Sequence, residues 1–535
     1  MTSWKKGGRW IAAALSVAML LPCIGCKKKE ATGVGKDVKL AADGIYPVEC
    51  DDTLTVWMSL NSELSTIVTE FGETELAKEL EKETGVKVKY SHPAQGQEAE
   101  QFNLMIASNE LPDVVQWNWY SFGAQPAIDA GYIVSLNDIM KKWSPNLTAL
   151  LRERPDLDTM IKTDEGNYYV YPFFRGSKID RVYLGPVIRK DLLDKVGMDV
   201  PQTIDEWEAV LRAFKTKLNV SIPFSCLSGF MSSGVFSGAY GVISDFYVDD
   251  DGKVKYGPMQ PGYLEYLKKM NQWYKEGLLD KNIANVDDKA IDANVLNESL
   301  GATVGTAGGG IGKWMLAKKE QNPSFELVGA PYPVLNKGDK PQFGVMDWDY
   351  LPSPSFAITS KCKNQELAAR FLDYGYGEKG KMLYNFGIEG VSYKMENDQP
   401  VLTELITNNP KKLTFSTALM SYAMGSYSGP FIQDTRIVEA MQSNPRNQRD
   451  AVQTWSETDM EKHKMPLISL TAEESKEVGN IMSEAGTYAT EMIMKFMVGV
   501  ESLDKWDEYI KQLERFDVSK AESIYQTALE RYNER

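Results

Sequence analysis

Histidine and cysteine are scarce in this 535-residue chain. The two histidines, His92 and His463, lie far apart in the sequence, which leaves a histidine-based metal site or a Ser-His-Asp triad with too few members. The cysteines that follow the N-terminal region, Cys50, Cys226 and Cys362, form no short-spacing pair, so neither a disulfide framework nor a zinc site is visible. We therefore predict no metal site and no cofactor.

An excess of positive charge is also lacking. The formal net charge is −15 and the pI is about 5.0, whereas a protein that wraps a nucleic acid needs clustered Lys and Arg to contact the phosphates. We therefore expect no nucleic-acid partner. With 43% hydrophobic and 25% charged residues, the chain has an ordinary globular composition and is long enough for two or more cores.

A long hydrophobic run is missing as well. The most apolar stretch is residues 10–21, about 12 residues, which is short of the roughly 20 that a membrane-spanning helix needs. Lys5, Lys6 and Arg9 precede this stretch, and Lys27-Lys28-Lys29 follow it closely. A basic start, a short apolar segment and a polar continuation predict an export signal.

The end of this signal is similar to the bacterial lipobox, in which a small residue precedes the cysteine that becomes lipidated. Gly25 and Cys26 match that pattern, although Cys23 stands where leucine is usual, three positions before Cys26. Cys23 itself is a poorer acceptor because Pro22 precedes it. We predict residues 1–26 to be the signal and anchor, with Cys26 lipidated and the protein held on the extracellular face of the bacterial cytoplasmic membrane. Residues 27–52 are expected to form a flexible tether.

The folded part begins with an alternating α/β pattern. Strand-like segments at 53–58, 86–90 and 112–117 enclose helical segments at 75–83 and 98–107. This β-α-β-α-β order predicts a parallel sheet flanked by helices. Later segments continue the pattern, with strands at 182–184, 302–304 and 355–358, helices at 203–215 and 365–374, and a helical C-terminal part from about residue 472.

Several segments, taken in order, resemble the family 1 extracellular solute-binding proteins of ABC importers, in particular the long lipoprotein branch associated with oligosaccharide uptake. The similar segments are 105–115 (MIASNELPDVV), 131–137 (GYIVSLN), 166–172 (GNYYVYP), 189–197 with 201–207, 385–391 (NFGIEGV) and 502–509 (SLDKWDEY). The resemblance therefore covers about residues 53–535.

The resemblance implies a two-lobed periplasmic-binding-protein-like fold of type II, with a ligand bound in a cleft between α/β lobes. On the family pattern, residues 53–173 and 355–410 form the first lobe, and residues 174–354 and 411–535, with the C-terminal helices, form the second. The hinge crossovers are expected near 173–176 and 351–355. The implied function is capture of a sugar or oligosaccharide for the permease of an ABC importer by a monomeric protein that is not an enzyme.

Sugar sites combine flat aromatic side chains with Asp, Asn, Arg or Glu hydrogen-bonding groups, because pyranose rings offer apolar faces and hydroxyl edges. In α/β folds such ligands lie at the carboxyl ends of strands. The candidates chosen on these two grounds are Trp117, Asn118, Trp119 and Tyr120 after the third strand, Ser59 and Asn61 after the first, Arg175 at the first crossover, Trp314 after a glycine-rich turn, and Asp347, Trp348 and Tyr350 before the second crossover.

Two other motifs are weaker. The glycine-rich segment 305–314 hints at a phosphate loop, but Ala307 stands where the first Walker glycine must be and Trp314 where Ser or Thr must bind magnesium. A glycine turn that lets the backbone approach the ligand is the better interpretation. Residues 249–252 read as a hairpin turn, and 216–223 lack the acidic ligands of a calcium loop.

Two alternative functions stay open at this stage. A surface lipoprotein that binds peptides, or presents a ligand to a membrane sensor, would have a similar pattern. A glycan-degrading enzyme would need two carboxylates across a sugar site, and the 74 acidic residues do not exclude such a pair. The charge of the sugar is also open, because Arg175, Lys178, Arg181 and Arg189 either pair with an acidic sugar or are solvated surface charges.

Overall fold

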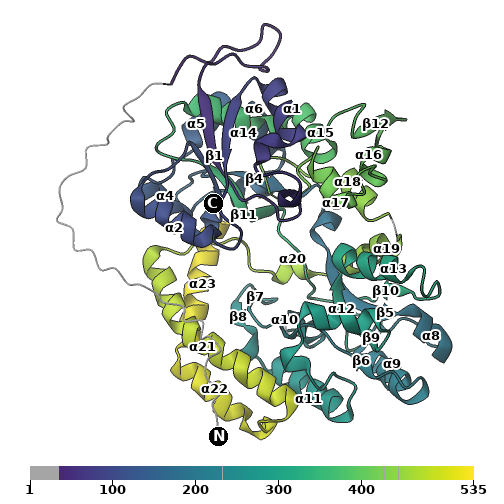
Figure 1. The fold of residues 1–535 in the computed structure, drawn as a ribbon. Helices are drawn as coiled ribbons and strands as arrows, with labels where there is room; N and C mark the ends of the chain where they lie inside the picture. The colour runs from purple at the N-terminus through teal and green to yellow at the C-terminus, as the bar shows by residue number, and fades with distance from the viewer. Residues whose placement is uncertain (1–34, 232, 426–427, 444) are drawn as a thin grey trace, which may run out of the picture.

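A computed structural model describes residues 35–231, 233–425, 428–443 and 445–535. The predicted signal peptide and the anchor Cys26 lie outside these residues. The chain forms two lobes, one above the other in Figure 1, and each lobe is built on its own β-sheet. Within the described residues, no helix combines the length and the apolar character that crossing a membrane requires.

The first lobe contains a five-stranded sheet in the order β2-β1-β3-β11-β4. Its strands are β1 (Thr53–Trp57), β2 (Lys87–Ser91), β3 (Val114–Trp117), β4 (Tyr171–Phe174) and β11 (Tyr350–Ile358). The predicted β-α-β-α-β unit is confirmed, since β1 pairs in parallel with β2 and β3, with α1 (Glu75–Thr84) and α2 (Glu98–Ser108) between them. β11 runs antiparallel to β3 and β4, so the carboxyl ends of β1, β3 and β4 share one edge with the start of β11.

Helices cover this sheet and fill its core with buried side chains such as Leu76, Leu147 and Leu367. They are α3 (Trp119–Phe122), α4 (Ala124–Asp129), α5 (Asn137–Trp143), α6 (Pro145–Glu153), α7 (Pro155–Met160), α14 (Gln365–Asp373) and α15 (Glu378–Phe386). The spacing of apolar residues along α14 gives it a face that is buried throughout, which explains why it lies against β11.

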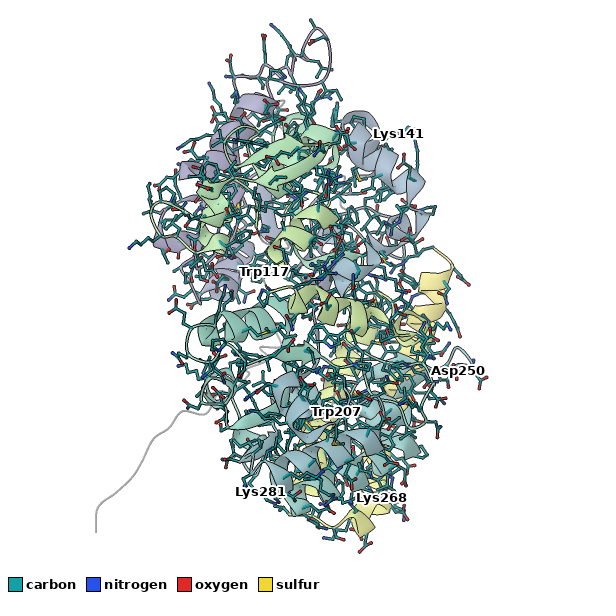
Figure 2. The ribbon with its side chains drawn as sticks, turned by 90° about the vertical axis from the view of Figure 1, so that its right-hand side faces the viewer. Trp117, Lys141, Trp207, Asp250, Lys268 and Lys281 are labelled. Carbon is teal, nitrogen blue, oxygen red and sulfur yellow. The ribbon has the colours of Figure 1, made fainter. Side chains whose placement is uncertain are left out.

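The second lobe is built on a four-stranded sheet in the order β10-β5-β9-β6. Its elements are β5 (Leu184–Arg189), α8 (Lys190–Val196), α9 (Ile204–Lys217), β6 (Ile222–Phe224), α10 (Ser228–Met231), α11 (Pro261–Glu276), α12 (Asp288–Leu296), β9 (Leu300–Thr306), α13 (Lys313–Lys318), β10 (Leu327–Gly329), α19 (Asn447–Ser456) and α20 (Met460–His463). The predicted hairpin is present as β7 (Phe246–Val248) and β8 (Val254–Tyr256). Trp207 of α9 lies in the centre of this core (Figure 2).

Three helices end the chain: α21 (Ala472–Val498), α22 (Trp506–Arg515) and α23 (Val518–Asn533). They belong to the second lobe, because their apolar faces join its core and the Tyr256 N–H of β8 donates to Glu522 of α23 at 2.7 Å. The Asn271 side chain of α11 donates to the Phe496 carbonyl of α21 at 2.8 Å.

The end of α23 also contacts the first lobe, as its course in Figure 1 shows. Arg531 Nε donates to Asp164 Oδ2 at 3.0 Å, and Arg535 Nη2 donates to Asp164 Oδ1 at 2.6 Å. Arg535 also donates to the Lys162 carbonyl at 2.8 Å, and its side chain is almost fully buried. The C-terminal helices therefore join the two lobes at a place separate from the crossovers.

The tether prediction is wrong for residues 35–52, which pack on the first lobe. The Gly35 N–H donates to the Lys363 carbonyl at 3.1 Å, the Val48 N–H donates to the Thr84 carbonyl at 2.8 Å, and the Tyr46 hydroxyl donates to the Arg370 carbonyl at 2.6 Å. The mostly polar composition of this segment suggested flexibility. Two of its side chains, those of Tyr46 and Val48, nevertheless pack against the first-lobe core. We call residues 35–52 the N-terminal strap.

The lobe boundary near residue 411 also differs from the prediction, because residues 415–425 and 428–441 pack on the first lobe. Met420, Met424 and Phe431 lie in its core, and the Phe174 N–H of β4 donates to the Phe431 carbonyl at 3.1 Å. The surrounding elements are the hairpin β12 (Tyr393–Glu396) and β13 (Gln399–Leu402), α16 (Glu404–Thr407), α17 (Phe415–Met420) and α18 (Thr435–Met441). The chain therefore returns to the second lobe only after α18.

Candidate functional site

The candidate site lies where the carboxyl edge of the first-lobe sheet meets the second lobe. Trp117 ends β3 opposite Ser355 of β11, and Phe174 ends β4 opposite Tyr350. Figure 2 shows Trp117 at the margin of the first lobe that faces the second. Side chains that follow β3 and β4 or precede β11 therefore lie toward the same edge of this sheet.

Trp117 is a partly exposed ring held in a fixed orientation. It stacks on Phe102 of α2 with ring centroids 4.2 Å apart and an interplanar angle of 12°, and Trp57 lies 6.0 Å away. The next residue, Asn118, caps α3 by accepting a hydrogen bond from the Ser121 N–H at 3.0 Å. Offset stacking of this kind fixes an indole without covering both of its faces.

Three predicted aromatic contacts are instead core residues. Trp119 is fully buried and donates from Nε1 to the Val115 carbonyl at 3.1 Å, and Tyr350 is fully buried with its hydroxyl 3.2 Å from that of Tyr169. Trp314 is buried in the second lobe and donates from Nε1 to Asp292 at 2.8 Å. The polar atom of each ring is satisfied inside a core. The strand-end rule selects segments and does not tell which of their rings pack into a core.

The other first-lobe candidates lie around this edge. The Tyr120 hydroxyl donates to the Ile468 carbonyl at 2.7 Å, which links α3 to the segment before α21. Ser59 and Asn61 are exposed in the loop after β1. Asn61 Oδ1 accepts from the Glu63 N–H at 2.8 Å and so holds that loop in its turn.

Between the two lobes lies a group of ion pairs. Arg175, directly after β4, pairs with Asp347, and Arg181 pairs both with Asp349 at 2.5 Å and with Glu461 of α20. Both arginine side chains are buried, with 4% and 6% of their surfaces exposed, respectively. Burial of unpaired guanidinium groups would be costly, so these carboxylates compensate charges placed at the crossovers.

Trp348 joins this group through a lysine. Lys464 Nζ lies 3.8 Å from the centroid of the Trp348 ring and donates to the Met346 carbonyl. Burial lowers the pKa of Lys464 to about 8, and the nearby carboxylate of Asp347 opposes this shift. The indole therefore has a cation against one face, an arrangement that is strengthened by desolvation.

Tyr183 is a member of the site that sequence reasoning missed. It lies just before β5, between the buried Val182 and Leu184, and its side chain is 38% exposed. Burial of the rest of the side chain, and to a lesser degree the Asp347 carboxylate, raise the pKa of Tyr183. The available sequence signal was one aromatic residue, Tyr183, between two aliphatic residues at the start of a predicted strand. For Lys464 no local signal exists, because its partners come from a distant part of the chain.

We refer to these residues together as the interlobe site: Trp117, Asn118, Arg175, Tyr183, Asp347, Trp348 and Lys464. The first lobe contributes Trp117 and Asn118, the crossovers contribute Arg175, Asp347 and Trp348, and the second lobe contributes Tyr183 and Lys464. Among the groups of His, Cys, Asp and Glu in the described ranges, none has the arrangement of a metal site.

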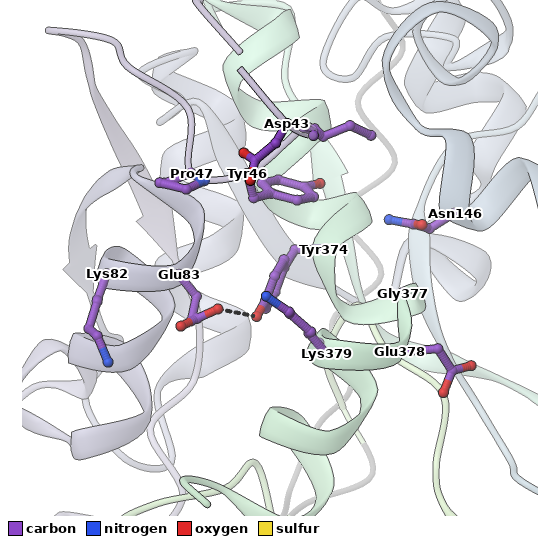
Figure 3. A pocket seen from close by; sticks show the side chains of 13 residues that line it. Asp43, Tyr46, Pro47, Lys82, Glu83, Asn146, Tyr374, Gly377, Glu378 and Lys379 are labelled. Carbon is purple, nitrogen blue, oxygen red and sulfur yellow. Dashed lines mark hydrogen bonds between the residues drawn. The ribbon is translucent and has the colours of Figure 1, made fainter. Parts of the chain in front are cut away.

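The first lobe also has a separate cavity of about 550 Å³ at its outer end, seen from close by in Figure 3. The N-terminal strap provides one wall with Asp43 and Tyr46, and Glu83, Tyr374 and Glu378 line the opposite side. The Tyr46 and Tyr374 rings meet edge to face at 5.1 Å. All of this lining comes from one lobe and the strap, so a ligand there could not favour one arrangement of the lobes through contacts with both.

These features define a two-lobed solute-binding protein. The chain belongs to the bacterial extracellular solute-binding proteins, whose family model matches residues 70–382.

Curated relatives match over most of the chain. The chain is 25% identical, over 555 residues, to the fructooligosaccharide ABC transporter substrate-binding protein FusA of Streptococcus pneumoniae serotype 4, covering 97% of this chain and 98% of that protein. It is 24% identical to the lipoprotein LipO of Bacillus subtilis over 432 residues, 78% of this chain and 79% of the relative.

Solved structures share the fold. The alginate-binding protein AlgQ2, solved without its calcium ion, is 26% identical with a TM-score of 0.69, covering 89% of this chain and 98% of AlgQ2. An extracellular solute-binding protein from Bifidobacterium longum subsp. infantis has a TM-score of 0.72 at 21% identity and covers 92% of this chain and 100% of its own. The two-lobed α/β fold expected from the sequence is thereby confirmed.

Proposed function

We propose that this protein binds a sugar or oligosaccharide at the interlobe site outside the cell and delivers it to the permease of an ABC importer. The observation that carries the proposal is the composition of the site, in which the partly exposed rings of Trp117 and Trp348 accompany Asp347 where the lobes meet. Aromatic faces and hydrogen-bonding carboxylates together suit a pyranose or furanose ring.

The position of the site between lobes supports a transport role. A ligand that contacts Trp117 of the first lobe and Tyr183 of the second makes more contacts when the lobes close, so its binding energy favours the closed form. A permease can distinguish the closed, loaded form from the open form by shape. In this function the sugar is released unchanged, so the protein is not an enzyme.

Relatives with named ligands support a sugar over a peptide. FusA is named for fructooligosaccharide, and AlgQ2 is named an alginate-binding protein. A further relative from Bacillus subtilis, MelE, is named a melibiose/raffinose/stachyose-binding protein. We further propose that Cys26 carries the lipid that holds the protein at the outer face of the cytoplasmic membrane, and that it acts there as a monomer.

A thermal-shift screen tests the proposal. A ligand that binds only the folded protein stabilises it by about 2.7 kcal/mol at 100 times its Kd, so an oligosaccharide that fits should raise Tm. Trp117→Ala and Trp348→Ala are each expected to weaken binding at least tenfold, as is usual for buried aromatic contacts, and to remove most of the shift.

The matched control is Trp143→Ala. Trp143 is a partly buried indole at the end of α5, and Lys141 of the same helix lies far from Trp117 in Figure 2. This variant should lower Tm without ligand but keep the full ligand shift. A shift with peptides and none with any glycan would contradict the sugar proposal, and turnover of an oligosaccharide by the purified protein would contradict its non-enzymatic part.

A further inference from the structure

The charged groups in the interlobe site and directly beside it, where Arg181 and Glu461 lie, are arranged in two layers. The inner layer is cationic, since Arg175 and Arg181 expose only 4% and 6% of their side chains. The outer layer is anionic, since Asp347 exposes 22% and Glu461 45% of theirs. Each buried guanidinium is therefore paired with a carboxylate that is more exposed than the guanidinium itself.

The third cation of this region, Lys464, is also engaged by neighbouring protein groups. Lys464 directs its Nζ to the Met346 carbonyl and to the face of Trp348. Around it lie the carboxylates of Asp347 and Asp349 and the guanidinium of Arg181. An anionic ligand at the exposed side of Trp348 would have the indole between itself and this ammonium group.

Among the residues that the structure describes, Lys178 and Arg154 are exposed cations next to these ion pairs, and both are already paired. Lys178 binds Glu461 at 2.5 Å, and Arg154 binds Asp156 at 2.6 Å. A ligand carboxylate would have to compete with a protein carboxylate for either of them. Exposed pairs contribute little to stability, but exchanging one anion for another brings no net gain in attraction.

The groups that a ligand can reach are thus hydrogen-bond acceptors and neutral groups. They include the partly exposed Asp347 carboxylate, the Tyr183 side chain and the partly exposed rings of Trp117 and Trp348. An ionised carboxylate accepts hydrogen bonds only, so it matches the hydroxyl donors of a sugar. A uronate carboxylate placed beside it has the same charge and no proton to donate, in a region where burial strengthens the repulsion.

We propose that the interlobe site selects neutral oligosaccharides, whose hydroxyls donate to Asp347, and excludes chains of uronic acids. This inference rests on the proposed function, because it names the ligand class of the same site. It answers the question that Arg175, Lys178, Arg181 and Arg189 leave open in the sequence. Arg175 pairs with Asp347, Lys178 with Glu461, Arg181 with Asp349 and Glu461, and Arg189 with Asp191, so these cations neutralise the protein's own carboxylates and do not recruit an acidic sugar.

Calorimetric titration with probes of equal length tests the inference. The probes are the neutral trisaccharides kestose, raffinose and maltotriose, and the acidic trisaccharide trigalacturonate. We expect at least one neutral probe to bind at least 100-fold more tightly than trigalacturonate. Asp347→Asn should weaken the neutral probe about tenfold and reduce the difference between the two classes to less than tenfold. Asp250→Asn, which removes the same charge from the exposed turn of the β7-β8 hairpin, should change neither affinity.

A salt titration of the unmodified protein gives a second readout that does not depend on how Asp347→Asn folds. Raising the ionic strength screens like-charge repulsion, so residual trigalacturonate binding should strengthen while neutral binding stays constant. Trigalacturonate binding as tightly as the neutral probes, or weakening with salt, would overturn the inference and leave the proposed function intact. If no glycan binds and a peptide does, the proposed function fails, and the inference fails with it.

Discussion

Gly85→Ala is expected to lower the free energy of unfolding by about 2–5 kcal/mol. Gly85 ends α1 in the left-handed conformation with φ of +74°, which costs alanine about 1–2 kcal/mol. An added Cβ would also lie 2.0 Å from the Val48 carbonyl oxygen of the N-terminal strap. Because that neighbour is backbone, the strap must shift, and forced shifts of packed structure typically cost another 1–3 kcal/mol. Urea unfolding followed by circular dichroism measures the loss.

Gly197→Ala is the matched control. Gly197 ends α8 in the same left-handed conformation, with φ of +66°, but among the described residues no heavy atom beyond its own chain neighbours lies within 4 Å of an added Cβ. In this variant the free energy of unfolding should fall only by the cost of placing alanine in the left-handed conformation, about 1–2 kcal/mol. Limited proteolysis adds a local readout, since the strap should become cleavable in Gly85→Ala and stay protected in Gly197→Ala. Equal losses in the two variants would show that the strap does not constrain α1.

Asp373→Ala is expected to lower the free energy of unfolding by about 2–5 kcal/mol as well. Asp373 ends α14, is fully buried, and accepts hydrogen bonds from the N–H groups of Asn146 at 3.0 Å and Leu147 at 2.8 Å. These donors begin α6 and have no partner within their own helix. Alanine leaves both buried donors unsatisfied, and each such group costs about 1–3 kcal/mol. Thermal and urea unfolding measure the effect. Asp287→Ala, which removes an exposed N-cap from α12, should cost only about 1 kcal/mol.

Asp373 also predicts a pH dependence. Burial raises its pKa to about 7, against the lowering effect of the Leu147 and Asn146 N–H groups. The folded protein therefore retains a proton that the unfolded chain has already released near pH 4. Relative to the non-titrating variant Asp373→Asn, the wild type should lose stability as the pH rises from about 4 to about 7 and stay level above 7. A stability difference that increases over this interval would mean that the carboxylate is ionised in the fold.

The elements of the fold were largely predictable from periodicity. The β-α-β-α-β unit of residues 53–117 and the strands around 302 and 355 lie where the patterns place them, because strand alternation and helix spacing are local properties. The antiparallel insertion of β11 between β3 and β4 was not predictable in this way. The position of β11 depends on where the chain re-enters the first lobe after it has formed much of the second lobe. A local sequence pattern carries no information about that.

The sequence indicated which segments contain the candidate site residues, but not which side chains of those segments are exposed. Trp117, Arg175, Asp347 and Trp348 lie at the expected strand ends, while Trp119 and Trp314 belong to the cores. Trp119 and Trp314 lie on α3 and α13, short helices that come after β3 and β9, and each helix directs its indole into a core, which the strand pattern alone does not reveal. Their role as ligand contacts stays a prediction until binding is measured.

The salt bridges of Arg531 and Arg535 to Asp164 limit how the two lobes can move. A body joined to another at one point can still turn in every direction, but joined at two separate points it can only rotate about the line through them. The crossovers are one such connection, and the end of α23, together with the Tyr120–Ile468 hydrogen bond beside it, is the other. If both persist, the lobes retain a single rotational degree of freedom, so every ligand that the protein accepts would be enclosed by the same swing, differing only in its angle.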